Sequence, residues 1–345
     1  MNIRRLSPDD ENKAKEIWKI CFGDSDDFLK VYFSEVADWN ASLGYYDKNE
    51  LVADLFMLDF CPKLANHACH ADFLAGCATL PQARKRGLMR ELVRYAMLDM
   101  RKRGRSVTYL HPFLHAFYRK FGYGTIAYIE RKTRKNPKGS HPHTKVCRKM
   151  EDVPIQKMVK AYREYMKRFD NCFLRDAKRF SAWLRLLFAD GGEALVYDDG
   201  SALAYALYYK ENEIAEVFEL VPGHSSDFLE GISASELRYF LPAYQTAEKS
   251  EEFTMMRVLE PEAVLRNAHI AKDEFVIHVY DEFLEEEDRF LVRKEKTENR
   301  VFSTKAKADI EASPEELAAM VTGVYQTGKA AEYFVPQTSC FFETY

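Results

Sequence analysis

Hydrophobic positions near the start of the chain recur at helical spacing. Residues 14–22 place alanine, isoleucine, tryptophan and cysteine on one helical face, and Ser7 and Asp10 before them supply an N-cap and an N3 acid. Ser25 is a second N-cap, in front of residues 28–33, whose aromatic and aliphatic side chains are again helically spaced. The pattern predicts two amphipathic helices at the start of the chain.

The next segments are rich in aromatic and aliphatic residues and are separated by turn residues, which is typical of antiparallel strands. We predict strands within 43–46, 51–58 and 70–80. Helical spacing returns after Gly87 and ends at Gly104, a natural C-terminal stop.

Three further segments complete the first unit. SVTYLHPF is a predicted strand, HAFYRKFGYG a short helix with a glycine turn, and YIERKTR a closing strand. Helices combined with antiparallel strands predict an α+β domain over residues 1–135.

The remainder of the chain divides into a linker and two units. Residues 136–149 are basic, contain Pro and Gly and lack periodicity, which indicates a linker. Residues 150–250 contain two helices followed by a three-strand meander, an order that repeats the first domain without its glycine- and arginine-bearing turn. Residues 251–345 contain further strands, beginning with FTMMRVL, and a helix capped by Ser313. The aromatic-rich end, SCFFETY, is expected to be docked, because exposing it forgoes about 25 cal/mol per Å² of apolar burial.

One segment combines local structure with chemistry. In CATLPQARKRGLMRELV, from Cys77 to Val93, a predicted strand enters a basic turn and leaves through Gly87 into a helix. Backbone N–H groups and the positive end of the helix dipole converge there, and arginines add charge-assisted hydrogen bonds. The order of strand, basic turn and helix predicts a phosphate site.

Length and composition narrow the classes of function. The 345 residues suffice for two or three domains, and 47% hydrophobic with 30% charged residues is ordinary globular composition. A net charge of −4 argues against a nucleic-acid binder. No window resembles a signal peptide or a membrane span, and seven irregularly spaced cysteines favour reduced thiols, so we expect a cytoplasmic protein.

The turn and the segment AFYRKFGYG about thirty residues downstream together resemble a known family. Arg84 to Met89 are similar to the phosphate-binding turn of GNAT acetyltransferases, although Met89 replaces a small residue of the general pattern. With two more domains behind it, the chain resembles the Eis-like (enhanced intracellular survival) acetyltransferases. The resemblance implies tandem GNAT folds, catalytic then degenerate, followed by a domain similar to sterol carrier proteins. It also implies oligomers, often hexamers.

The resemblance assigns roles to individual residues. It implies acetyl-CoA as co-substrate, with the pantetheine arm along the strand, the pyrophosphate at the turn and the thioester near Phe113 and Leu114. Tyr118 would be the general acid, and the C-terminal carboxylate, here on Tyr345, the general base. The expected cofactor-binding residues are Cys77, Ala78, Thr79, Arg84, Lys85, Arg86, Gly87, Leu88, Met89, Arg90, Phe113 and Leu114.

Acetyl transfer to an amine needs the groups that the resemblance supplies. The amine must lose a proton, and the departing thiolate must gain one. A tyrosine of pKa about 10 suits reprotonation of a thiolate, and an α-carboxylate of pKa about 3.5 becomes a better base when an aromatic environment desolvates it. A backbone N–H in a splayed sheet would stabilise the carbonyl oxygen.

Several alternatives accompany these assignments. Tyr118 has a rival acid in Tyr123, and Cys77 has no His or Asp pattern to make it a nucleophile. Cys69 and His70 resemble part of a metal cluster with Cys61 and His67, but adjacent strand residues point to opposite faces, so no metal is expected.

We expect an N-acetyltransferase that transfers acetyl directly, in a ternary complex, to a primary amine of a small polycation or a peptide. The rival is a CoA-sensing or apolar-ligand-binding protein without turnover. Nucleic-acid binding through the basic linker is not favoured, because no aromatic residues alternate with its basic residues to stack on bases. The expected partners are an amine substrate and further copies of the chain, with no nucleic acid and no membrane.

Overall fold

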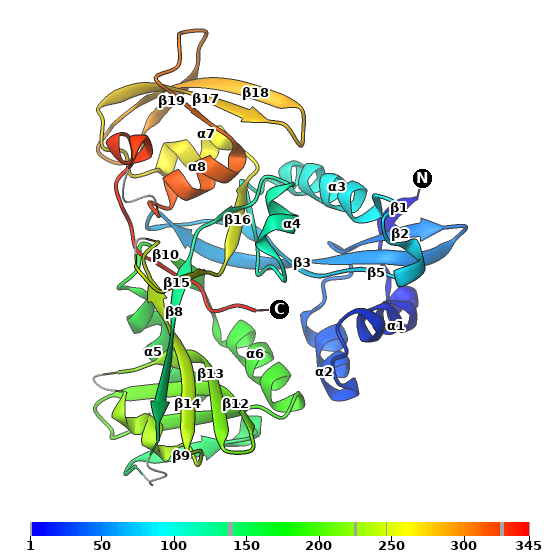
Figure 1. The fold of residues 1–345 in the computed structure, drawn as a ribbon, viewed down its shortest axis with the longest axis vertical. Helices are drawn as coiled ribbons and strands as arrows, with labels where there is room; N and C mark the ends of the chain where they lie inside the picture. The colour runs from blue at the N-terminus through cyan, green and yellow to red at the C-terminus, as the bar shows by residue number, and fades with distance from the viewer. Residues whose placement is uncertain (1, 137–140, 224–225, 246, 325–327, 345) are drawn as a thin grey trace.

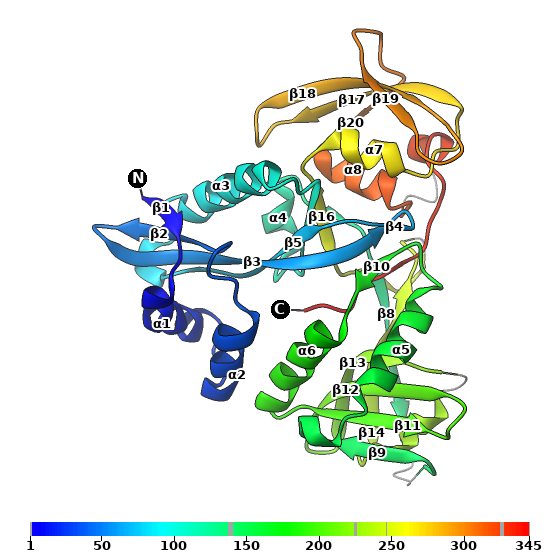
Figure 2. The ribbon, with the colours of Figure 1, turned by 180° about the vertical axis from the view of Figure 1, so that it is seen from behind.

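The computed structural model describes residues 2–136, 141–223, 226–245, 247–324 and 328–344. Three sheets organise the chain, and helices pack against each of them (Figure 1). Seen from behind, the same arrangement shows the first sheet between the second and third (Figure 2).

The first sheet has ten strands within the described residues, and its main path runs β1–β2–β3–β5–β6–β16–β7. The predicted strands of the first domain are confirmed as β2, β3, β5 and β6. The strands of this sheet are β1 (Ile3–Arg5), β2 (Leu43–Asp47), β3 (Glu50–Leu64), β4 (His67–Ala68), β5 (Ala71–Thr79), β6 (Val107–Leu110), β7 (Gly124–Thr125), β10 (Asn171–Leu174), β16 (Met255–Val258) and β21 (Ser339–Cys340).

The predicted helices of the first domain are also confirmed, and their caps explain where they begin. The Ser7 backbone N–H donates to Asp10 Oδ2 at 2.9 Å in a capping box ahead of the first helix. The Phe28 N–H donates to Ser25 Oγ at 3.1 Å. The helices are α1 (Glu11–Cys21), α2 (Asp26–Val31), α3 (Leu88–Lys102) and α4 (His115–Arg119), with short turns η1 (Pro8–Asp10), η2 (Tyr32–Val36) and η3 (Pro81–Ala83).

The second sheet has seven strands in the described part, in the order β15–β8–β14–β13–β12–β11–β9. The predicted meander is confirmed, because β11, β12 and β13 pair antiparallel in sequence order. Its elements are β8 (Tyr128–Lys135), β9 (Thr144–Cys147), β11 (Glu193–Asp198), β12 (Leu203–Glu211), β13 (Ile214–Val221), β14 (Glu236–Ala243) and β15 (Ser250–Glu252), with α5 (Ile155–Met166), α6 (Ala177–Ala189), η4 (Met150–Asp152) and η5 (Asp227–Gly231).

Two predictions around the expected linker are wrong. YIERKTR does not close the first sheet: β8 pairs with β14 and β15 of the second. The segment 141–149, predicted as linker, contains β9, which pairs with β11; residues 137–140 lie outside the described residues. Alternating exposure along β8 identifies a strand but not its partner, because any free sheet edge offers the same backbone hydrogen bonds.

The third sheet has four strands in the described residues, in the order β19–β18–β17–β20. FTMMRVL is a strand, as predicted, but it belongs to the first sheet: β16 lies between β6 and β7, and its residues are all buried. The remaining elements are β17 (Glu274–Asp281), β18 (Glu286–Arg293), β19 (Arg300–Ser303), β20 (Ile310–Ala312), α7 (Pro261–Asn267), α8 (Pro314–Val321) and η6 (Lys329–Glu332).

The end of the chain returns from the third sheet to the middle of the molecule. β21 pairs parallel with β10, which pairs antiparallel with β3. Beyond β21, Phe341 and Phe342 are buried. Both ribbon views show this tail beside α6 and next to β3 (Figures 1 and 2). Docking of the aromatic terminus is therefore confirmed for the residues up to 344.

Candidate active site

The parallel strands β5 and β6 are paired over only two residues. Asp72 and Phe73 pair with Thr108 and Tyr109, after which β5 continues to Thr79 without β6 beside it. We call the space beyond this last pair the first opening. The other edge of β5 remains paired with β3. An extended ligand in the first opening would meet backbone groups of β5 that no strand occupies.

The basic turn follows directly at the end of β5. Lys85 and Gly87 have φ angles of +63° and +82°, and Gly87 stands immediately before α3. The first helical hydrogen bond runs from the Glu91 N–H to the Gly87 carbonyl at 3.1 Å. The N–H groups of residues 88–90 therefore precede the first hydrogen bond of the helix and have no acceptor within it. An anion at this position is stabilised by these donors and by the helix dipole.

Cationic side chains of the turn are exposed and partly held by neighbours. Arg84 Nε donates to the Thr79 carbonyl at 3.0 Å, and Arg86 pairs with Asp47 at 2.9 Å. The guanidinium of Arg90 lies 4.9 Å from the ring centre of Phe283 in the third unit. Among the expected phosphate ligands, Arg90 therefore contacts the third unit. Residues 84–87 are exposed to solvent.

Tyr118, on α4, reaches the first opening from the opposite side. Only 5% of its surface is exposed, and its hydroxyl interacts with the Cys77 thiol on β5. Burial, and then Cys77, raise the pKa of Tyr118 well above its usual value. Burial likewise raises the pKa of Cys77 to about 12, although Tyr118 opposes the shift. Both groups are therefore protonated at neutral pH, and Tyr118 presents an O–H donor between the parting strands.

The rival tyrosine has a different environment. Tyr123 is fully buried, and its hydroxyl donates to Thr108 Oγ1 at 3.4 Å, away from the end of β5. Cys77 of the expected cofactor strand interacts with Tyr118 through a hydrogen bond as well as through charge, whereas it acts on Tyr123 through charge.

Phe113 and Leu114 precede α4 and are exposed, at 75% and 53%. The ring centre of Phe113 lies 5.9 Å from that of Tyr118. These apolar side chains therefore lie near the hydroxyl that the resemblance places at the thioester.

The comparisons agree with this geometry. Residues 2–126 match the family model of an acetyltransferase (GNAT) domain. The protein carries a GNAT acetyltransferase domain. No curated protein sequence matches the chain.

Solved structures extend the likeness in fold to the whole chain. Eis1 from Mycobacterium abscessus shares 15% identity with a TM-score of 0.75, and the match covers 100% of both chains. A probable N-acyltransferase from Enterococcus faecalis V583 shares 14% identity with a TM-score of 0.79 over 99% of both chains. A GCN5-related N-acetyltransferase from Kribbella flavida shares 14% identity, with a TM-score of 0.75, over 99% of this chain and 98% of that one. The full-length fold is therefore Eis-like.

Two buried polar residues close to the candidate site were missed from the sequence. Asp54 on β3 pairs in register with Ala78, and its Oδ2 has no hydrogen-bond partner among the described residues. Burial raises its pKa well above the usual value. The sequence does mark this residue, as the lone acid in the apolar run LVADLFML. A buried carboxyl oxygen without a partner is rare in native structures and calls for an explanation.

His111 is the second missed residue, and it lies between β6 and α4. Its ring centre is 4.5 Å from that of Phe253, and Nδ1 is buried without a hydrogen-bond partner in the described part of the chain. Burial, followed by His115 and Arg131, lowers its pKa to about 4. The imidazole is therefore neutral at pH 7 and is a rival proton acceptor.

The predicted general base lies outside the described residues, because these end at residue 344. The described tail leads toward the first opening: the ring centre of Phe341 lies 5.7 Å from that of Tyr109, in the last residue pair of β5 and β6. The resemblance therefore remains the source of the role given to Tyr345.

The third unit, residues 251–345, contacts both α3 and the turn that follows Tyr118. Phe283 accepts a hydrogen bond from Arg94 at 2.6 Å through its carbonyl, and its ring centre is 5.2 Å from that of Phe121. Arg257 on β16 donates to the Phe121 carbonyl and to Asp281. The basic residues of α3 thus serve partly to dock another unit of the acetyltransferase, which helical periodicity alone could not show.

Two negative observations concern the described residues only. Among them, no group of three or more His, Cys, Asp or Glu side chains is arranged to hold a metal ion. No helix in the described ranges is long and apolar enough to cross a membrane.

Proposed function

We propose that the protein is an acetyl-CoA-dependent N-acetyltransferase that transfers the acetyl group directly to a primary amine in a ternary complex. The observation that carries the proposal is the position of Tyr118, a buried tyrosine whose hydroxyl interacts with Cys77 on the part of β5 that β6 does not cover, just before β5 ends at the basic turn. A proton donor beside one strand and an anion site at the end of that strand suit a thioester attached to a pyrophosphate.

The acyl donor would lie along the first opening. Backbone groups of residues 77–79 would pair with the pantetheine arm, and the N–H groups of residues 88–90, with the side chains of 84–86, would bind the pyrophosphate. The apolar side chains of Phe113 and Leu114 would contact the region of the thioester. Acetyl-CoA is a co-substrate in this scheme, and no step needs a metal.

The chemical step balances with groups of this chain. The neutral amine nitrogen attacks the thioester carbonyl carbon, a C–N bond forms and the C–S bond breaks. Tyr118 delivers a proton to the departing sulfur, and the Tyr345 carboxylate takes the proton that the amine loses. The raised pKa of Tyr118 keeps its hydroxyl protonated throughout the neutral range before the donor arrives.

Acidic groups near α1 and α6 favour a cationic acceptor. Trp18 Nε1 donates to Asp24 Oδ2 at 2.6 Å, and Ser25 Oγ donates to Asp190 Oδ1 at 3.3 Å. Asp190 thus binds the residue that follows Asp24, and burial, and then Asp24, raise the pKa of Asp190. A protonated amine between them would relieve this repulsion. A small polyamine-like or aminoglycoside-like molecule, or a lysine side chain, has the required charge.

We also propose that the second and third units are a degenerate GNAT-like domain and a sterol-carrier-like domain. The pairing of β13 with β14 repeats that of β5 with β6, since it is parallel and ends at Val217 and Tyr239 while β13 continues to Val221. This supports a second, degenerate GNAT-like domain, predicted over residues 150–250, whose sheet also includes β8 and β9 from before that range. The sheet β17–β20 and helices α7 and α8, within the predicted range 251–345, would form the sterol-carrier-like domain. We call the space beyond the last pair of β13 and β14 the second opening.

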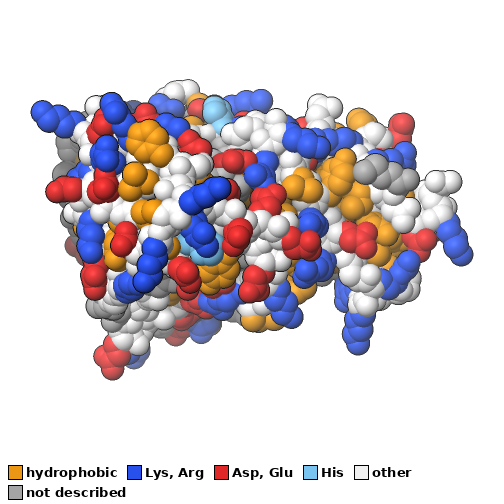
Figure 3. All heavy atoms as spheres, turned by 90° about the horizontal axis from the view of Figure 1, so that it is seen from above, with side chains coloured by type: hydrophobic (Ala, Val, Ile, Leu, Met, Phe, Trp, Pro, Cys, Tyr) orange, Lys and Arg blue, Asp and Glu red, His pale blue; other side chains and the backbone are white. Residues whose placement is uncertain are grey.

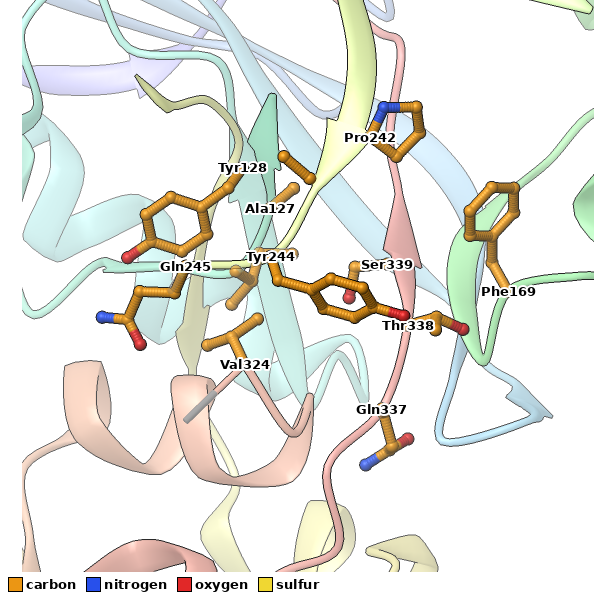
Figure 4. A pocket seen from close by; sticks show the side chains of 12 residues that line it. Ala127, Tyr128, Phe169, Pro242, Tyr244, Gln245, Val324, Gln337, Thr338 and Ser339 are labelled. Atoms are coloured by element: carbon orange, nitrogen blue, oxygen red, sulfur yellow. The ribbon is translucent and has the colours of Figure 1, made fainter. Parts of the chain in front are cut away.

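The rival function, an apolar-ligand binder without turnover, would need a larger cavity than the one at the junction of the three units. A cavity there, lined by Tyr128, Phe169, Tyr244 and Thr338 among others, has a volume of about 90 Å³ (Figure 4). Ligand sites for drug-sized molecules occupy roughly 300–1,000 Å³. The cavity is therefore too small for a lipid.

The thiols and the surface charges bear on the compartment and the partners of the protein. All seven cysteines are unpaired, which supports a reducing compartment such as the cytoplasm. On the face in Figure 3, basic and acidic side chains are interspersed, which is unlike a nucleic-acid surface. Self-association into oligomers remains a prediction from the family resemblance.

A panel of amines tests the proposed function. The full chain is incubated with acetyl-CoA and polyamines, aminoglycosides or lysine peptides, and free thiol release is followed. Turnover with at least one amine above the rate of hydrolysis is the expected result. Tight acetyl-CoA binding with no turnover across the panel would favour the sensor.

A further inference from the structure

A loop of the third unit lies against the helix that begins at the phosphate turn. The loop, residues 282–285, joins β17 to β18, and both ribbon views show this end of the third sheet beside α3 (Figures 1 and 2). Arg94 of α3 donates from Nη1 to the Phe283 carbonyl at 2.6 Å and from Nη2 to the Leu284 carbonyl at 3.4 Å. Its Nη1 also lies 3.5 Å from Glu285 Oε1. The loop is therefore bound to α3 by its backbone as well as by charge.

Asp281, the last residue of β17, fixes the conformation of the loop. Its Oδ1 accepts hydrogen bonds from the N–H groups of Phe283 and Leu284, each at 3.0 Å. Its Oδ2 accepts from Arg257 of β16, whose side chain is fully buried. Because the loop is bound on both sides, it can hold a side chain in one place.

The same network reaches the turn behind Tyr118. Arg257 also donates to the Phe121 carbonyl, and the Phe121 N–H donates to the Tyr118 carbonyl at 2.9 Å. A Cβ on Gly122 would collide with Arg257 Nη1, so a glycine is required for this approach. The ring centre of Phe283 lies 5.2 Å from that of Phe121, which is 6.4 Å from that of Tyr118. The loop thus contacts α3 and also the turn that follows the proposed general acid.

Arg90 is the side chain through which the loop reaches the phosphate turn. It lies in the first turn of α3, and its guanidinium is 4.9 Å from the ring centre of Phe283, which is 5% exposed. A guanidinium over a ring uses its face, so the N–H donors on its edge stay available for an anion. Within the described residues no hydrogen bond or ion pair occupies those donors, whereas Arg86 pairs with Asp47.

This arrangement lowers the cost of binding an anion. A long side chain loses rotamer freedom when it binds a ligand, and a ring that already restricts the guanidinium reduces that loss. Acetyl-CoA would extend from the pyrophosphate to the thioester, so its two ends need groups held at a fixed separation. The loop contacts Arg90 at one end and the support of Tyr118 at the other.

We propose that Phe283 is a positioning residue for the acyl donor: it orients Arg90 toward the pyrophosphate, so that loop 282–285 completes the acetyl-CoA site from the third unit. This inference rests on the proposed use of acetyl-CoA.

The test is a double-mutant cycle between Phe283 and Arg90 in the full chain, with calorimetric binding of CoA as the readout. Arg90→Gln removes the cation. Phe283→Leu removes the ring but keeps an apolar side chain and the carbonyl that binds Arg94. In the parent chain Phe283→Leu should weaken CoA binding about two- to fivefold, the size of one exposed cation–π contact. In the Arg90→Gln chain it should weaken binding less than about 1.5-fold, because no cation remains to be oriented.

Two failures are distinguishable in this cycle. Equal weakening by Phe283→Leu in both chains would overturn the positioning role, since Phe283 would then act without Arg90. Absence of CoA binding in the parent chain would instead overturn the proposed function, and this inference with it.

A shorter donor separates the pyrophosphate from the rest of the site. S-acetylpantetheine lacks the pyrophosphate, so Phe283→Leu should change its kcat/KM less than about 1.5-fold while lowering that of acetyl-CoA about two- to fivefold. Equal losses with the two donors would also overturn the positioning role.

Phe290→Leu is the matched control for packing in the third unit. Phe290 lies on β18 and is also 5% exposed, and within the described residues it makes no ring or cation–π contact. Its replacement should lower the melting temperature about as much as Phe283→Leu and leave CoA binding unchanged. Equal weakening of CoA binding by both changes would refute the inference. If Phe283→Leu does not fold, Phe283→Met takes its place in the cycle, since a flexible thioether fills a similar volume.

Discussion

The two openings share strand geometry but differ in what surrounds them. The first opening ends in an exposed basic turn, and Gly87 then leads into the 15-residue helix α3. Its buried acid Asp54 has no hydrogen-bond partner at Oδ2 among the described residues. The second has the short turn η5 after β13, and its buried acid, Glu219, is bound by Arg175. The difference lies in the buried acids: Asp54 Oδ2 has no partner among the described residues, whereas Glu219 is paired with Arg175, which also binds Glu343 near the end of the described chain.

The largest expected effect is removal of the cation from the second opening. Arg175→Met leaves Glu219 and Glu343 buried without it and should lower the free energy of unfolding by about 3–5 kcal/mol at pH 7. Burial already raises the pKa of Glu219, and loss of Arg175 would raise that pKa further, so the penalty grows as pH rises above the unfolded value of about 4.3 and is absent below it. Denaturant unfolding at pH 4 and pH 7 measures this; an equal loss at both pH values contradicts it.

Tyr118→Phe should have the largest effect in the first opening. Loss of the proton donor should lower kcat about 10²- to 10³-fold while acetyl-CoA binding changes little. Tyr123→Phe is the matched control: it removes a hydroxyl that binds Thr108 and should lower kcat less than about threefold, with a stability loss of about 1 kcal/mol. Steady-state kinetics and calorimetric binding of acetyl-CoA distinguish the two; parallel loss of binding and turnover would make Tyr118 structural.

Gly87→Ala tests the phosphate turn that the second opening lacks. A Cβ at Gly87 would meet nothing within 4 Å, so the change strains only the backbone, whose φ is +82°. The strain costs about 1–2 kcal/mol, and we expect acetyl-CoA to bind about tenfold more weakly. Gly104→Ala, at the other end of α3, has a similar φ of +77° and equal space. It should cost similar stability and leave binding unchanged; equal weakening by both would sink the assignment.

The smallest expected effect is Asp54→Asn. Burial raises the pKa of Asp54, so the folded protein keeps a proton that the unfolded chain releases above about pH 3.9. This residue therefore opposes folding increasingly as pH rises, and Asp54→Asn should stabilise the protein by about 1 kcal/mol at pH 7 and by nothing near pH 4. Thermal melting across this range measures the difference. A destabilised variant at pH 7 would mean that Asp54 has an ionic partner.

Local elements of the site were predictable from the sequence. Helix starts at Ser25 and Ser313 follow from side chains that satisfy N–H groups a few residues away, and both caps form as predicted. The phosphate turn likewise depends on neighbours in sequence, with Gly87 in the left-handed conformation immediately before α3. The roles of Tyr118 and Tyr345 came from the family resemblance, because nothing local marks a general acid or base.

Pairing across long distances was not predictable. The strand at 128–135 and the strand at 255–258 were found as strands but assigned to the wrong sheets. An edge strand offers the same donors and acceptors to any partner, so the choice depends on packing by residues far along the chain. Asp54 and His111 were missed for the same reason: their burial is a property of the assembled fold.

The sequence by itself therefore determined the helices, most strands, the phosphate turn and the aromatic character of the chain end, since each is set by interactions over a few residues. Only the tertiary structure decided which sheet each strand joins, and that the chain end reaches the second sheet, where Phe342 lies against Phe240. It also decided the environment of Arg175, which in the stretch NCFLRDAKRF has the pattern of a solvated arginine. Its buried state depends on Glu219 and Glu343, and these meet it only after the chain has folded back across three sheets.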